Sequence, residues 1–322
     1  MKIATVTLNP AIDQTVSVND FRMNTVNRGQ GMRFDAGGKG VNVASYLADY
    51  GLNVAVTGFL GEANTQIFEA LFEAKGIEDH FVRIPGSTRT GVKIVDEANQ
   101  QTTDINMPGQ SPSPEAIHML FESLGRLSAT CDWFVLSGNL PPETPENIYA
   151  SLIDLLKSNR KQVILDTSRE ALIQGIQAAP DIVKPNIDEL EQLVGHPLEG
   201  MADIEQAARG LLEGGIRLVV VSMGADGAIF VDNEASLIAR PPTVLVKSTV
   251  GAGDAMVAGT LTGKILGLSL PECARLATAF SLGAITRVGA HLPEVEILEA
   301  YSRQVEIQQI ERIPLTSGAA NN

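Results

Sequence analysis

The stretch from Ser248 to Asp254, Ser-Thr-Val-Gly-Ala-Gly-Asp, precedes a run of small and apolar residues from Ala255 to Leu266 that is typical of a helix. Gly251 and Gly253 would then lie at the helix start, where backbone N–H groups have no partner within the helix. Glycines let a ligand approach the backbone closely, and the helix dipole adds positive potential. We therefore predict an anion-binding turn with Asp254 at its edge.

Asp254 itself has two interpretations. An acidic residue in the first turn of a helix is stabilised by the helix dipole and needs no catalytic role. Alternatively, the carboxylate orients a hydroxyl group and accepts its proton late in a phosphoryl transfer. In either case the dipole predicts a low pKa, which would make Asp254 a weak base.

Short apolar runs alternate with helical patterns along most of the chain. This alternation predicts a mostly parallel sheet covered by helices on both faces. The predicted strands are Ile3–Leu8, Val54–Thr57, Trp133–Leu136, Val163–Leu165, Ile182–Val183 and Leu218–Val221. The predicted helices are Val41–Tyr50, Asn64–Lys75, Pro114–Leu127, Pro145–Lys157 and Ile204–Glu213, with Gly51, Gly76 and Gly214 as C-caps of three of them.

The predicted strands end in small, polar or charged residues. Ligands of open parallel sheets bind beyond the carboxyl ends of the strands, so we expect a site assembled from several of these ends. They are Asn9–Asp13, Gly58, Ser137-Gly138-Asn139, Asp166–Ser168, Lys184-Pro185-Asn186 and Ser222–Gly224.

Two segments lack the α/β alternation. Residues 13–35 and 87–107 show weak strand patterns, with a turn near Ala98, and we predict that they form a small inserted β layer. This layer would serve as a lid, as a dimer surface or only as an elaboration of the domain edge, and the sequence alone favours none of the three. The α/β domain would then comprise residues 1–12, 36–86 and 108–312, followed by a flexible tail at 313–322. A structural hairpin is predicted from Ala228 to Ala239.

Composition restricts the class of partner and the compartment. The 322-residue chain has 24 Lys and Arg against 38 Asp and Glu, and a net charge of −14 argues against a nucleic-acid-binding surface. Cys131 and Cys273 have no metal-like spacing, which favours reduced, buried thiols. Without a signal peptide or a membrane-spanning run, we expect a soluble cytoplasmic protein with no membrane partner.

A second glycine-rich segment runs from Asp35 to Ala44. It has neither the P-loop spacing nor the dinucleotide-binding spacing, which disfavours NAD. Gly37 and Gly38 would let a polyol lie against the backbone, while Asn42 binds its hydroxyls and Lys39 supplies charge for a phosphate. A tight strand–helix turn with a solvated lysine is an equally good interpretation of this motif taken alone.

Taken together, Gly37–Ala44 and Ser248–Asp254 resemble the two signatures of the phosphofructokinase B family of ribokinase-like sugar kinases. Lys184–Glu189 and Ser222–Gly227 are similar to two further motifs of that family, and the resemblance extends from Thr5 to about Gly289. It implies a ribokinase-like, doubly wound α/β fold with a small inserted antiparallel β lid. It also implies phosphorylation of a sugar hydroxyl by ATP with Mg²⁺.

The resemblance also assigns residues to roles. Asp254 matches the catalytic base, and Gly251, Ala252 and Gly253 match the anion hole. Matches to the ATP and Mg²⁺ side are Lys184, Asn186, Ser222, Gly224, Gly227, Ser248, Thr249 and Val250, with Glu189 acting on the metal through water. Matches to the sugar side are Asp13, Gly37, Gly38, Lys39 and Asn42, and the strand end Ser137, Gly138 and Asn139 is expected there too.

Within the family, Thr7–Asp13 and Ala36–Ala44 look most like the branch that contains 1-phosphofructokinases and tagatose-6-phosphate kinases. Their acceptor already carries a phosphate, for which Arg28 and Arg89 are candidates, together with Lys39 and Lys93. Many members of that branch read Arg-Ile-Asn-Val-Lys where this chain has Arg89-Thr90-Gly91-Val92-Lys93, so one sugar contact is missing here. Asn106-Met107-Pro108-Gly109 resembles the corresponding segment of the 6-phosphofructokinases of the family.

The resemblance therefore implies conversion of fructose 1-phosphate and ATP to fructose 1,6-bisphosphate and ADP, in a homodimer formed through the β lid. Tagatose 6-phosphate and fructose 6-phosphate are alternative acceptors. A catalytically silent sugar-phosphate-binding regulator is an alternative of a different class, but it would not need Asp254, Asn186 and Glu189 together. A dehydrogenase is disfavoured because the dinucleotide-binding motif is absent.

Overall fold

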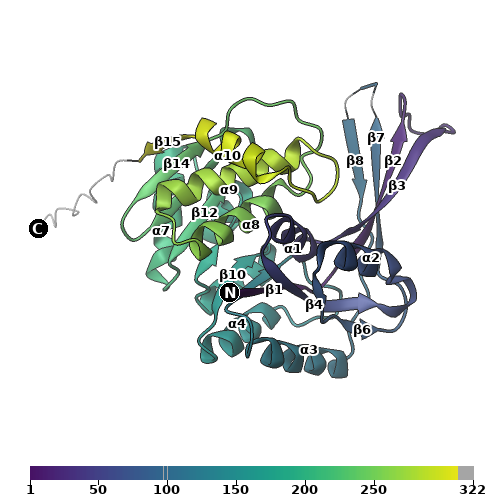
Figure 1. Cartoon of the computed structure of the whole chain (residues 1–322), viewed down its shortest axis with the longest axis horizontal. Helices are drawn as coiled ribbons and strands as arrows, with labels where there is room; N and C mark the ends of the chain where they lie inside the picture. Colours follow the sequence, from purple (N-terminus) through teal and green to yellow (C-terminus); the bar gives the residue numbers. More distant parts are fainter. Residues whose placement is uncertain (97, 100, 311–322) are drawn as a thin grey trace, which may run out of the picture.

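The computed structural model of the chain describes residues 1–96, 98–99 and 101–310 (Figure 1). Its strands are β1 (Lys2–Thr7), β2 (Ala11–Val18), β3 (Gly29–Gly37), β4 (Asn53–Gly61), β5 (Glu78–Asp79), β6 (Val82–Ile84), β7 (Thr90–Asp96), β8 (Gln101–Ile105), β9 (Trp133–Ser137), β10 (Gln162–Asp166), β11 (Ile182–Val183), β12 (Leu218–Ser222), β13 (Ala228–Asp232), β14 (Ser236–Arg240) and β15 (Glu306–Gln309). Its α-helices are α1 (Lys39–Asp49), α2 (Gln66–Lys75), α3 (Pro114–Leu127), α4 (Ile148–Ser158), α5 (Arg169–Gln177), α6 (Ile187–Val194), α7 (Met201–Glu213), α8 (Ala252–Ile265), α9 (Leu270–Ile285) and α10 (Val295–Gln304). Two short 3₁₀ helices, η1 (Glu62–Asn64) and η2 (Gly224–Asp226), complete the set.

The central sheet has the strand order β15-β14-β13-β12-β11-β10-β9-β1-β4-β5, with β6 paired to β4. The strands from β12 to β5 run parallel, and β13, β14 and β15 add antiparallel strands at one edge. The chain leaves β1 first toward β4 and later returns to β9 on the other side. The strand order therefore reverses beside β1, which is where open sheets of this kind bind ligands.

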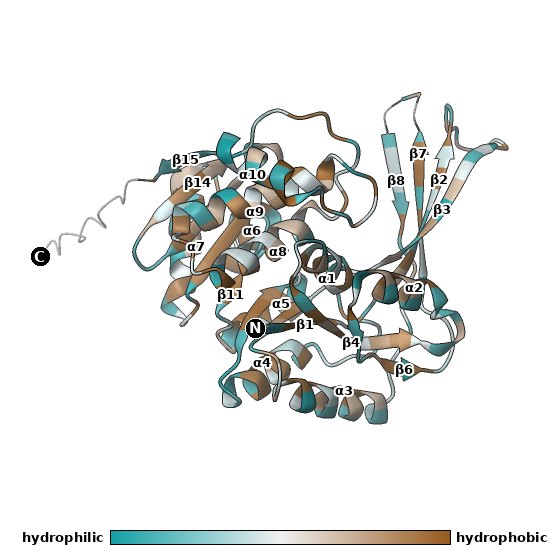
Figure 2. Ribbon diagram, in the orientation of Figure 1, coloured by the Kyte–Doolittle hydropathy of each residue, from teal (hydrophilic) through white to brown (hydrophobic). Residues whose placement is uncertain are grey.

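Helices cover both faces of the central sheet, and each face has its own hydrophobic core. One core joins α1, α2, α8, α9 and α10 to the sheet, and the other joins α3, α4, α5, α6 and α7 to the opposite face. The inner strands of this sheet, such as β1, β9 and β12, are mostly hydrophobic, and the edge strands β5 and β15 are hydrophilic. The outer helices turn hydrophilic sides outward (Figure 2). This pattern confirms the predicted doubly wound α/β fold.

All six strands predicted from apolar runs exist, with ends shifted by up to four residues, and the 228–239 hairpin forms as β13 and β14. The helices α5, α6, α9 and α10 were not among the predicted ones. Gly76 caps α2 in the left-handed conformation as expected. Gly214 is the C-cap of α7 as predicted, with φ −74°, and the left-handed conformation follows at Gly215, whose φ is 95°.

The small sheet consists of β3, β2, β7 and β8 in that order. β2 pairs antiparallel with β3 and parallel with β7, and β7 pairs antiparallel with β8. In Figure 1 it projects from the rest of the chain beside α1 and α2. Because side chains alternate along each strand, one face of this sheet is turned toward α1 and the start of α8, and the other is turned away from them.

The face of the small sheet that is turned toward the α/β domain is polar. On this face, Asp13 of β2 lies beside Asp35 of β3, and Thr15 of β2 lies between Arg33 of β3 and Lys93 of β7. These side chains line a cleft of about 580 Å³ together with Asn42, Tyr46 and Gly251. The alternate positions on β3 and β8 carry large apolar side chains that stay exposed, namely Met32, Phe34 and Ile105. No helix in the described part of the chain is long and apolar enough to span a membrane. The predicted tail at 313–322 lies outside the described residues.

Candidate active site

The N-terminus of α8 forms the centre of the candidate site. Gly251 is its N-cap with φ 81°, a left-handed conformation that favours glycine, and the helix starts at Ala252. Gly253 is in the first turn, and a Cβ on it would lie 3.5 Å from Nζ of Lys184. The start of the helix therefore combines free N–H groups with a lysine ammonium group, as an anion site requires.

Asp254 lies in the same first turn of α8 and is 6 % exposed. Burial raises its pKa from 3.8 to about 6; Lys39 counteracts this rise, and the neighbouring carboxylate of Asp166 adds to it. The low pKa expected from the helix dipole alone is therefore wrong, because removing the carboxylate from water has the larger effect. A carboxylate with a pKa near 6 is a much better base than the sequence suggested.

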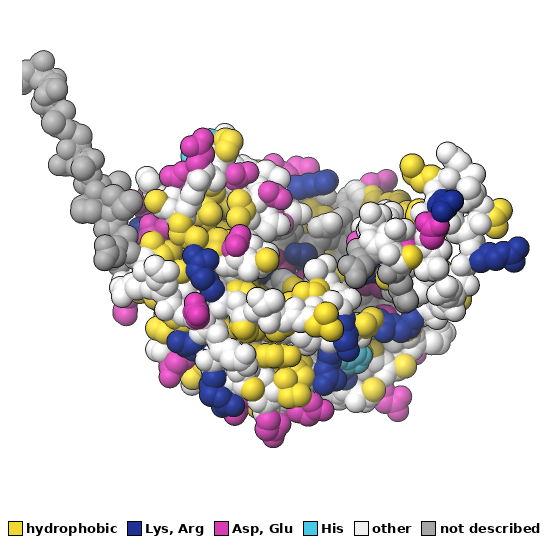
Figure 3. Space-filling model, turned by 90° about the horizontal axis from the view of Figure 1, so that it is seen from above, with side chains coloured by type: hydrophobic (Ala, Val, Ile, Leu, Met, Phe, Trp, Pro, Cys, Tyr) yellow, Lys and Arg dark blue, Asp and Glu magenta, His cyan; other side chains and the backbone are white. Residues whose placement is uncertain are grey.

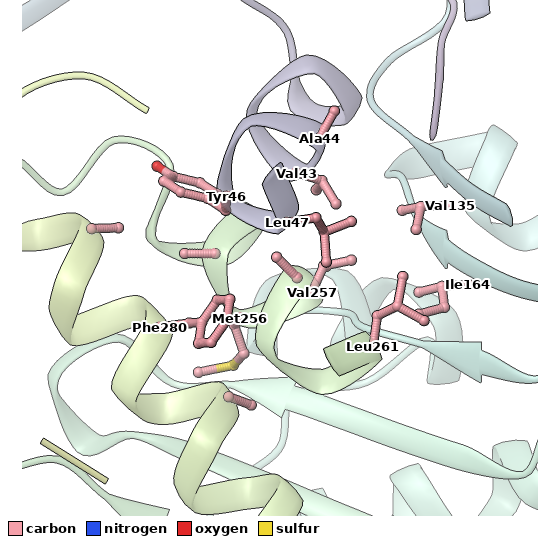
Figure 4. Packing of buried hydrophobic residues seen from close by; sticks show 14 of the residues in the cluster. Val43, Ala44, Tyr46, Leu47, Val135, Ile164, Met256, Val257, Leu261 and Phe280 are labelled. Atoms are coloured by element: carbon pink, nitrogen blue, oxygen red, sulfur yellow. The ribbon is translucent and has the colours of Figure 1, made fainter. Parts of the chain in front are cut away.

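Helix α1 presents its polar residues to Asp254. Asn42 is buried, and its Nδ2 donates a 2.8 Å hydrogen bond to Oδ2 of Asp254. One turn further along α1, Tyr46 lies beside Gly251. Apolar residues on the same helices hold this arrangement together: Leu47 of α1, Val257 and Met256 of α8, and Phe280 of α9 belong to one core (Figure 4).

Asp166, at the carboxyl end of β10, joins two lysines that lie far apart in the sequence. Its side chain is fully buried, with Nζ of Lys39 3.1 Å and Nζ of Lys184 3.2 Å from its oxygens. Burial alone would raise the pKa of Asp166, but the two ammonium groups hold it below its usual value. The sequence analysis placed Asp166 at a strand end without assigning it a role, and the signal that could have found it is an acid directly after an apolar strand.

The segment Ser137–Asn139, at the carboxyl end of β9, contacts Asp166 and neighbouring side chains and does not line the cavities described below. Oγ of Ser137 is buried and donates to Asp166, and the carbonyl of Gly138 accepts from Tyr149 and Thr167. The exposed Asn139 accepts a hydrogen bond from Ser168 and is not part of any of the cavities described below. These contacts favour a supporting position for Ser137 and Gly138.

Two cavities meet at the start of α8. The first, of about 490 Å³, has mainly apolar walls and is called the apolar cavity. Its lining includes Ser222, Gly224, Gly227, Pro241, Val244, Thr249, Ala252, Gly253, Met256, Thr278 and Leu282. Four of the eight residues predicted for the nucleotide line it: Ser222, Gly224, Gly227 and Thr249. Ser248 and Val250 line the cleft of about 580 Å³ under the small sheet instead, and Lys184 and Asn186 line neither. The shape and lining suit a flat, largely apolar ring with a phosphate chain directed toward Gly253.

The second cavity, of about 240 Å³, is polar and lies between the small sheet and α1; it is called the polar cavity. Its lining includes Asp13, Gly38, Lys39, Asn42, Arg89, Gly91, Lys93, Asp104, Asn106, Val250 and Asp254. Asp13 is half-buried, and its burial raises its pKa, although Lys93 and Arg89 counteract the rise. A Cβ at position 37 would lie 2.5 Å from Oδ2 of Asp13, so glycine is required there.

The two arginines predicted for the acceptor phosphate have different positions. Arg89 lines the polar cavity, and its guanidinium donates to the carbonyls of Met107 and Asn9 at 3.1 and 3.3 Å. Burial lowers the pKa of this guanidinium, and nearby Asp13 counteracts the effect. Arg28, just before β3, is exposed and lines none of the cavities described here. The structure thus brings Arg89 to the candidate site but not Arg28.

Asn186 and Glu189 begin α6 as a capping box. Oδ1 of Asn186 accepts from the N–H of Glu189, and Oε2 of Glu189 accepts from the N–H of Asn186. No group of three or more acidic, histidine or cysteine side chains able to hold a metal occurs among the described residues. A single carboxylate still fits Mg²⁺, which keeps most of its ligands as water and phosphate oxygens.

These contacts define what the site can do chemically. A buried carboxylate lies at the wall of a polar cavity, and a helix N-terminus with a lysine lies between that carboxylate and an apolar cavity. A hydroxyl in the polar cavity would meet the base, and a phosphoryl group from the other side would meet the free N–H groups. The arrangement therefore suits phosphoryl transfer between two bound molecules.

Comparisons with known proteins agree with this geometry. Residues 6–297 match the family model described as pfkB family carbohydrate kinase. A 1-phosphofructokinase of Rhodobacter capsulatus is 48 % identical over 311 residues, which cover 96 % of this chain and 98 % of the relative. A structure of a possible 1-phosphofructokinase from Thermotoga maritima has a TM-score of 0.88 at 27 % identity, covering 97 % of this chain and 100 % of that one. Phosphofructokinase-2 of Escherichia coli has a TM-score of 0.88 at 28 % identity, with 94 % and 99 % covered.

Proposed function

Because the chain belongs to the pfkB family of carbohydrate kinases, we propose that it transfers the γ-phosphoryl group of ATP to the C6 hydroxyl of fructose 1-phosphate. The products are fructose 1,6-bisphosphate and ADP. The observation that carries the proposal is the position of Asp254: a buried carboxylate with a pKa near 6, at the wall of the polar cavity and in the first turn of the anion-binding helix.

In this proposal Asp254 accepts the proton of the attacking hydroxyl as the oxygen–phosphorus bond forms. The hydrogen bond from Asn42 keeps one carboxylate oxygen fixed, so the other is free to face the acceptor. The N–H groups of Ala252 and Gly253 stabilise the charge on the transferred group, and the ammonium of Lys184 adds to that stabilisation. Preorganised donors of this kind supply much of the catalysis of phosphoryl transfer.

The apolar cavity would hold ATP, with Ser222, Gly224, Gly227 and Thr249 along the nucleotide. Asn186 and Glu189 would hold Mg²⁺ through water, and the ion would supply positive charge that offsets the charge of the ATP phosphates. Lys39 lines the polar cavity, where the ion pair with Asp166 holds its ammonium group.

The acceptor phosphate is assigned to Arg89, Lys93 and Lys39, which line the polar cavity together with Asp13. Asp13 would bind sugar hydroxyls, with Gly37 and Gly38 leaving room beside it. Fructose 6-phosphate, phosphorylated at its C1 hydroxyl, is the alternative acceptor, favoured by the similarity to phosphofructokinase-2. Tagatose 6-phosphate remains the third possibility within the same chemistry.

ADP formation against a panel of acceptors tests the proposal. The panel is fructose 1-phosphate, fructose 6-phosphate, tagatose 6-phosphate and unphosphorylated fructose, each with Mg²⁺ and ATP. We expect kcat/KM for fructose 1-phosphate to exceed the others by roughly a hundredfold, as for a site built on specific polar contacts. If another sugar phosphate is preferred, the proposed acceptor is wrong but the proposed phosphoryl transfer from ATP stands. If no acceptor of the panel is phosphorylated, the result favours a catalytically silent regulator.

We also propose the domain division at 13–35 and 87–107, a cytoplasmic location that suits the two buried free thiols, and a homodimer formed through the small sheet. Met32, Phe34 and Ile105 leave an apolar face exposed on this sheet, and hydrophobic side chains are visible on its projecting end in Figure 3. A second copy would cover this face, and Arg28 could reach an acceptor only across such an interface.

The oligomeric state tests the dimer. Phe34→Asp should convert the dimer to a monomer in light-scattering measurements, because it places a charge in the apolar face. Met119→Asp is the matched control, since Met119 is a similarly exposed apolar residue on α3, remote from the small sheet. A wild-type chain that is monomeric at micromolar concentration would contradict the proposal.

A further inference from the structure

The polar cavity contains one position where the small sheet lacks a side chain. Gly91 on β7 pairs directly with Asp13 on β2. Val92 pairs with Ile105, the last residue of β8, so Asn106 follows beside Gly91 on the other side. Asp13, Gly91 and Asn106 therefore form one row across three strands, and all three line the polar cavity.

The missing side chain leaves a space between a carboxylate and an amide. A Cβ at position 91 would lie 3.4 Å from Oδ1 of Asn106 and 3.4 Å from Oδ1 of Asp13. One non-hydrogen atom placed there is thus in contact with both side chains at once. The backbone of Gly91 is outside the left-handed region, so its conformation does not explain why glycine is present.

The chemistry of the two flanking groups suits a hydroxyl in this space. The carboxylate of Asp13 only accepts hydrogen bonds, whereas the amide of Asn106 can also donate. The amide oxygen of Asn106 faces this space in the structure, so the amide has to turn by 180° to present its Nδ2. A hydroxyl there would then donate to Asp13 and accept from Nδ2 of Asn106, which satisfies its donor and one lone pair. A phosphate would not fit, because the carboxylate would repel it.

We propose that Asn106 is a specificity-determining residue that binds a sugar hydroxyl in the space left by Gly91, opposite Asp13. The inference rests on the proposed kinase function and assigns the acceptor's hydroxyl contacts to this row. Gly91 and Asn106 then act as one unit: the glycine admits the hydroxyl, and the amide supplies the donor that Asp13 lacks.

Gly91→Ala and Asn106→Ala test this assignment separately and together. An added methyl at position 91 makes only ordinary van der Waals contacts, so the variant should fold while the space is filled. We expect each variant to raise KM for the preferred sugar phosphate roughly 10- to 100-fold, with KM for ATP unchanged, since one hydrogen bond in a charged network is lost. The preference over the other acceptors should narrow by a similar factor.

The double variant gives the sharpest result. If both substitutions remove the same hydroxyl contact, KM of the double variant for the sugar phosphate should not exceed the higher of the two single-variant KM values. If their effects are independent, the two increases in KM should multiply. Gly31→Ala, on β3 with open space around it, and Asn53→Ala, exposed at the start of β4, are matched controls that should behave as wild type.

Two other outcomes overturn the inference and separate it from the proposed function. If both single variants keep the wild-type KM and acceptor preference while Asp13→Asn raises KM, Asn106 has no part in recognition, but the kinase assignment stands. If the wild-type chain phosphorylates no sugar phosphate of the panel, the kinase assignment fails, and this inference fails with it.

Discussion

Asn42 donates a 2.8 Å hydrogen bond to the carboxylate of Asp254, across 212 residues of sequence. The bond joins the first turns of α1 and α8, so the two glycine-rich segments of the sequence form one site. It also fixes the orientation of a buried carboxylate whose pKa burial raises to about 6. The predictions below follow from this contact and from its neighbours.

Asp254→Asn should remove the carboxylate that acts as the base while keeping a side chain of nearly the same size and shape. We expect kcat to fall by about 10²- to 10⁴-fold, with little change in KM for either substrate, in steady-state kinetics. The same variant should be more stable at pH 7 by about 1 to 3 kcal/mol, because the folded state raises the pKa of Asp254 above its unfolded value and therefore disfavours the carboxylate. In the wild type, the cost of ionising Asp254 in the folded state grows as pH rises from about 4 to about 6. The difference in free energy of unfolding between the variant and the wild type should therefore vanish below about pH 4. Asp154→Asn on the surface of α4 is the control, and an unchanged kcat would refute the role of Asp254.

The pH dependence should follow the ionisation of Asp254. Because the base must be deprotonated, kcat/KM should fall as pH decreases through about 6. The bond from Asn42 stabilises the carboxylate, so Asn42→Ala should raise the pKa of Asp254 and move this acidic limb to higher pH. A limb that stays in place would show that the bond does not tune the base.

Asp166→Asn should destabilise the fold and weaken ATP binding. It leaves the ammonium groups of Lys39 and Lys184 without their shared counter-ion, and Lys184 is only 5 % exposed. Breaking such a buried network costs about 3 to 5 kcal/mol, measurable by denaturant unfolding. Ser137→Ala, which removes one neutral donor to Asp166, should cost much less. Equal losses for the two variants would contradict the electrostatic explanation.

Arg89→Ala should affect the acceptor more than the nucleotide. Arg89 lines the polar cavity and not the apolar one, so KM for the sugar phosphate should rise about 10- to 100-fold while KM for ATP changes little. Arg126→Ala, on the exposed surface of α3, is the control. Similar effects on both substrates would exclude Arg89 from the acceptor site.

Tyr46→Phe should stabilise the protein. The hydroxyl of Tyr46 is buried beside Gly251 and has no hydrogen-bond partner within the described residues. An unsatisfied buried hydroxyl costs about 1 to 3 kcal/mol, so the variant should unfold at a higher temperature in calorimetry. A lower Tm would mean that the hydroxyl has a partner in the folded protein, such as a buried water.

The fold class and the two glycine-rich turns could be predicted from the chain alone, because apolar runs of strand length and glycines before helices reflect local constraints. The glycine turn at the start of α8, with Asp254 beside it, was predictable for the same reason. The strand ends were predictable as a group, since parallel strands place their carboxyl ends at one edge.

Only the tertiary structure decided how these pieces act together. The raised pKa of Asp254 depends on burial by residues from other elements, which opposes and exceeds the local effect of the helix dipole. The ion-pair network of Asp166 joins β10 to residues 39 and 184, and the row of Asp13, Gly91 and Asn106 depends on strand register. Such contacts between distant residues leave no periodic pattern in the chain. Packing and register create them, so they could be read only from the folded molecule.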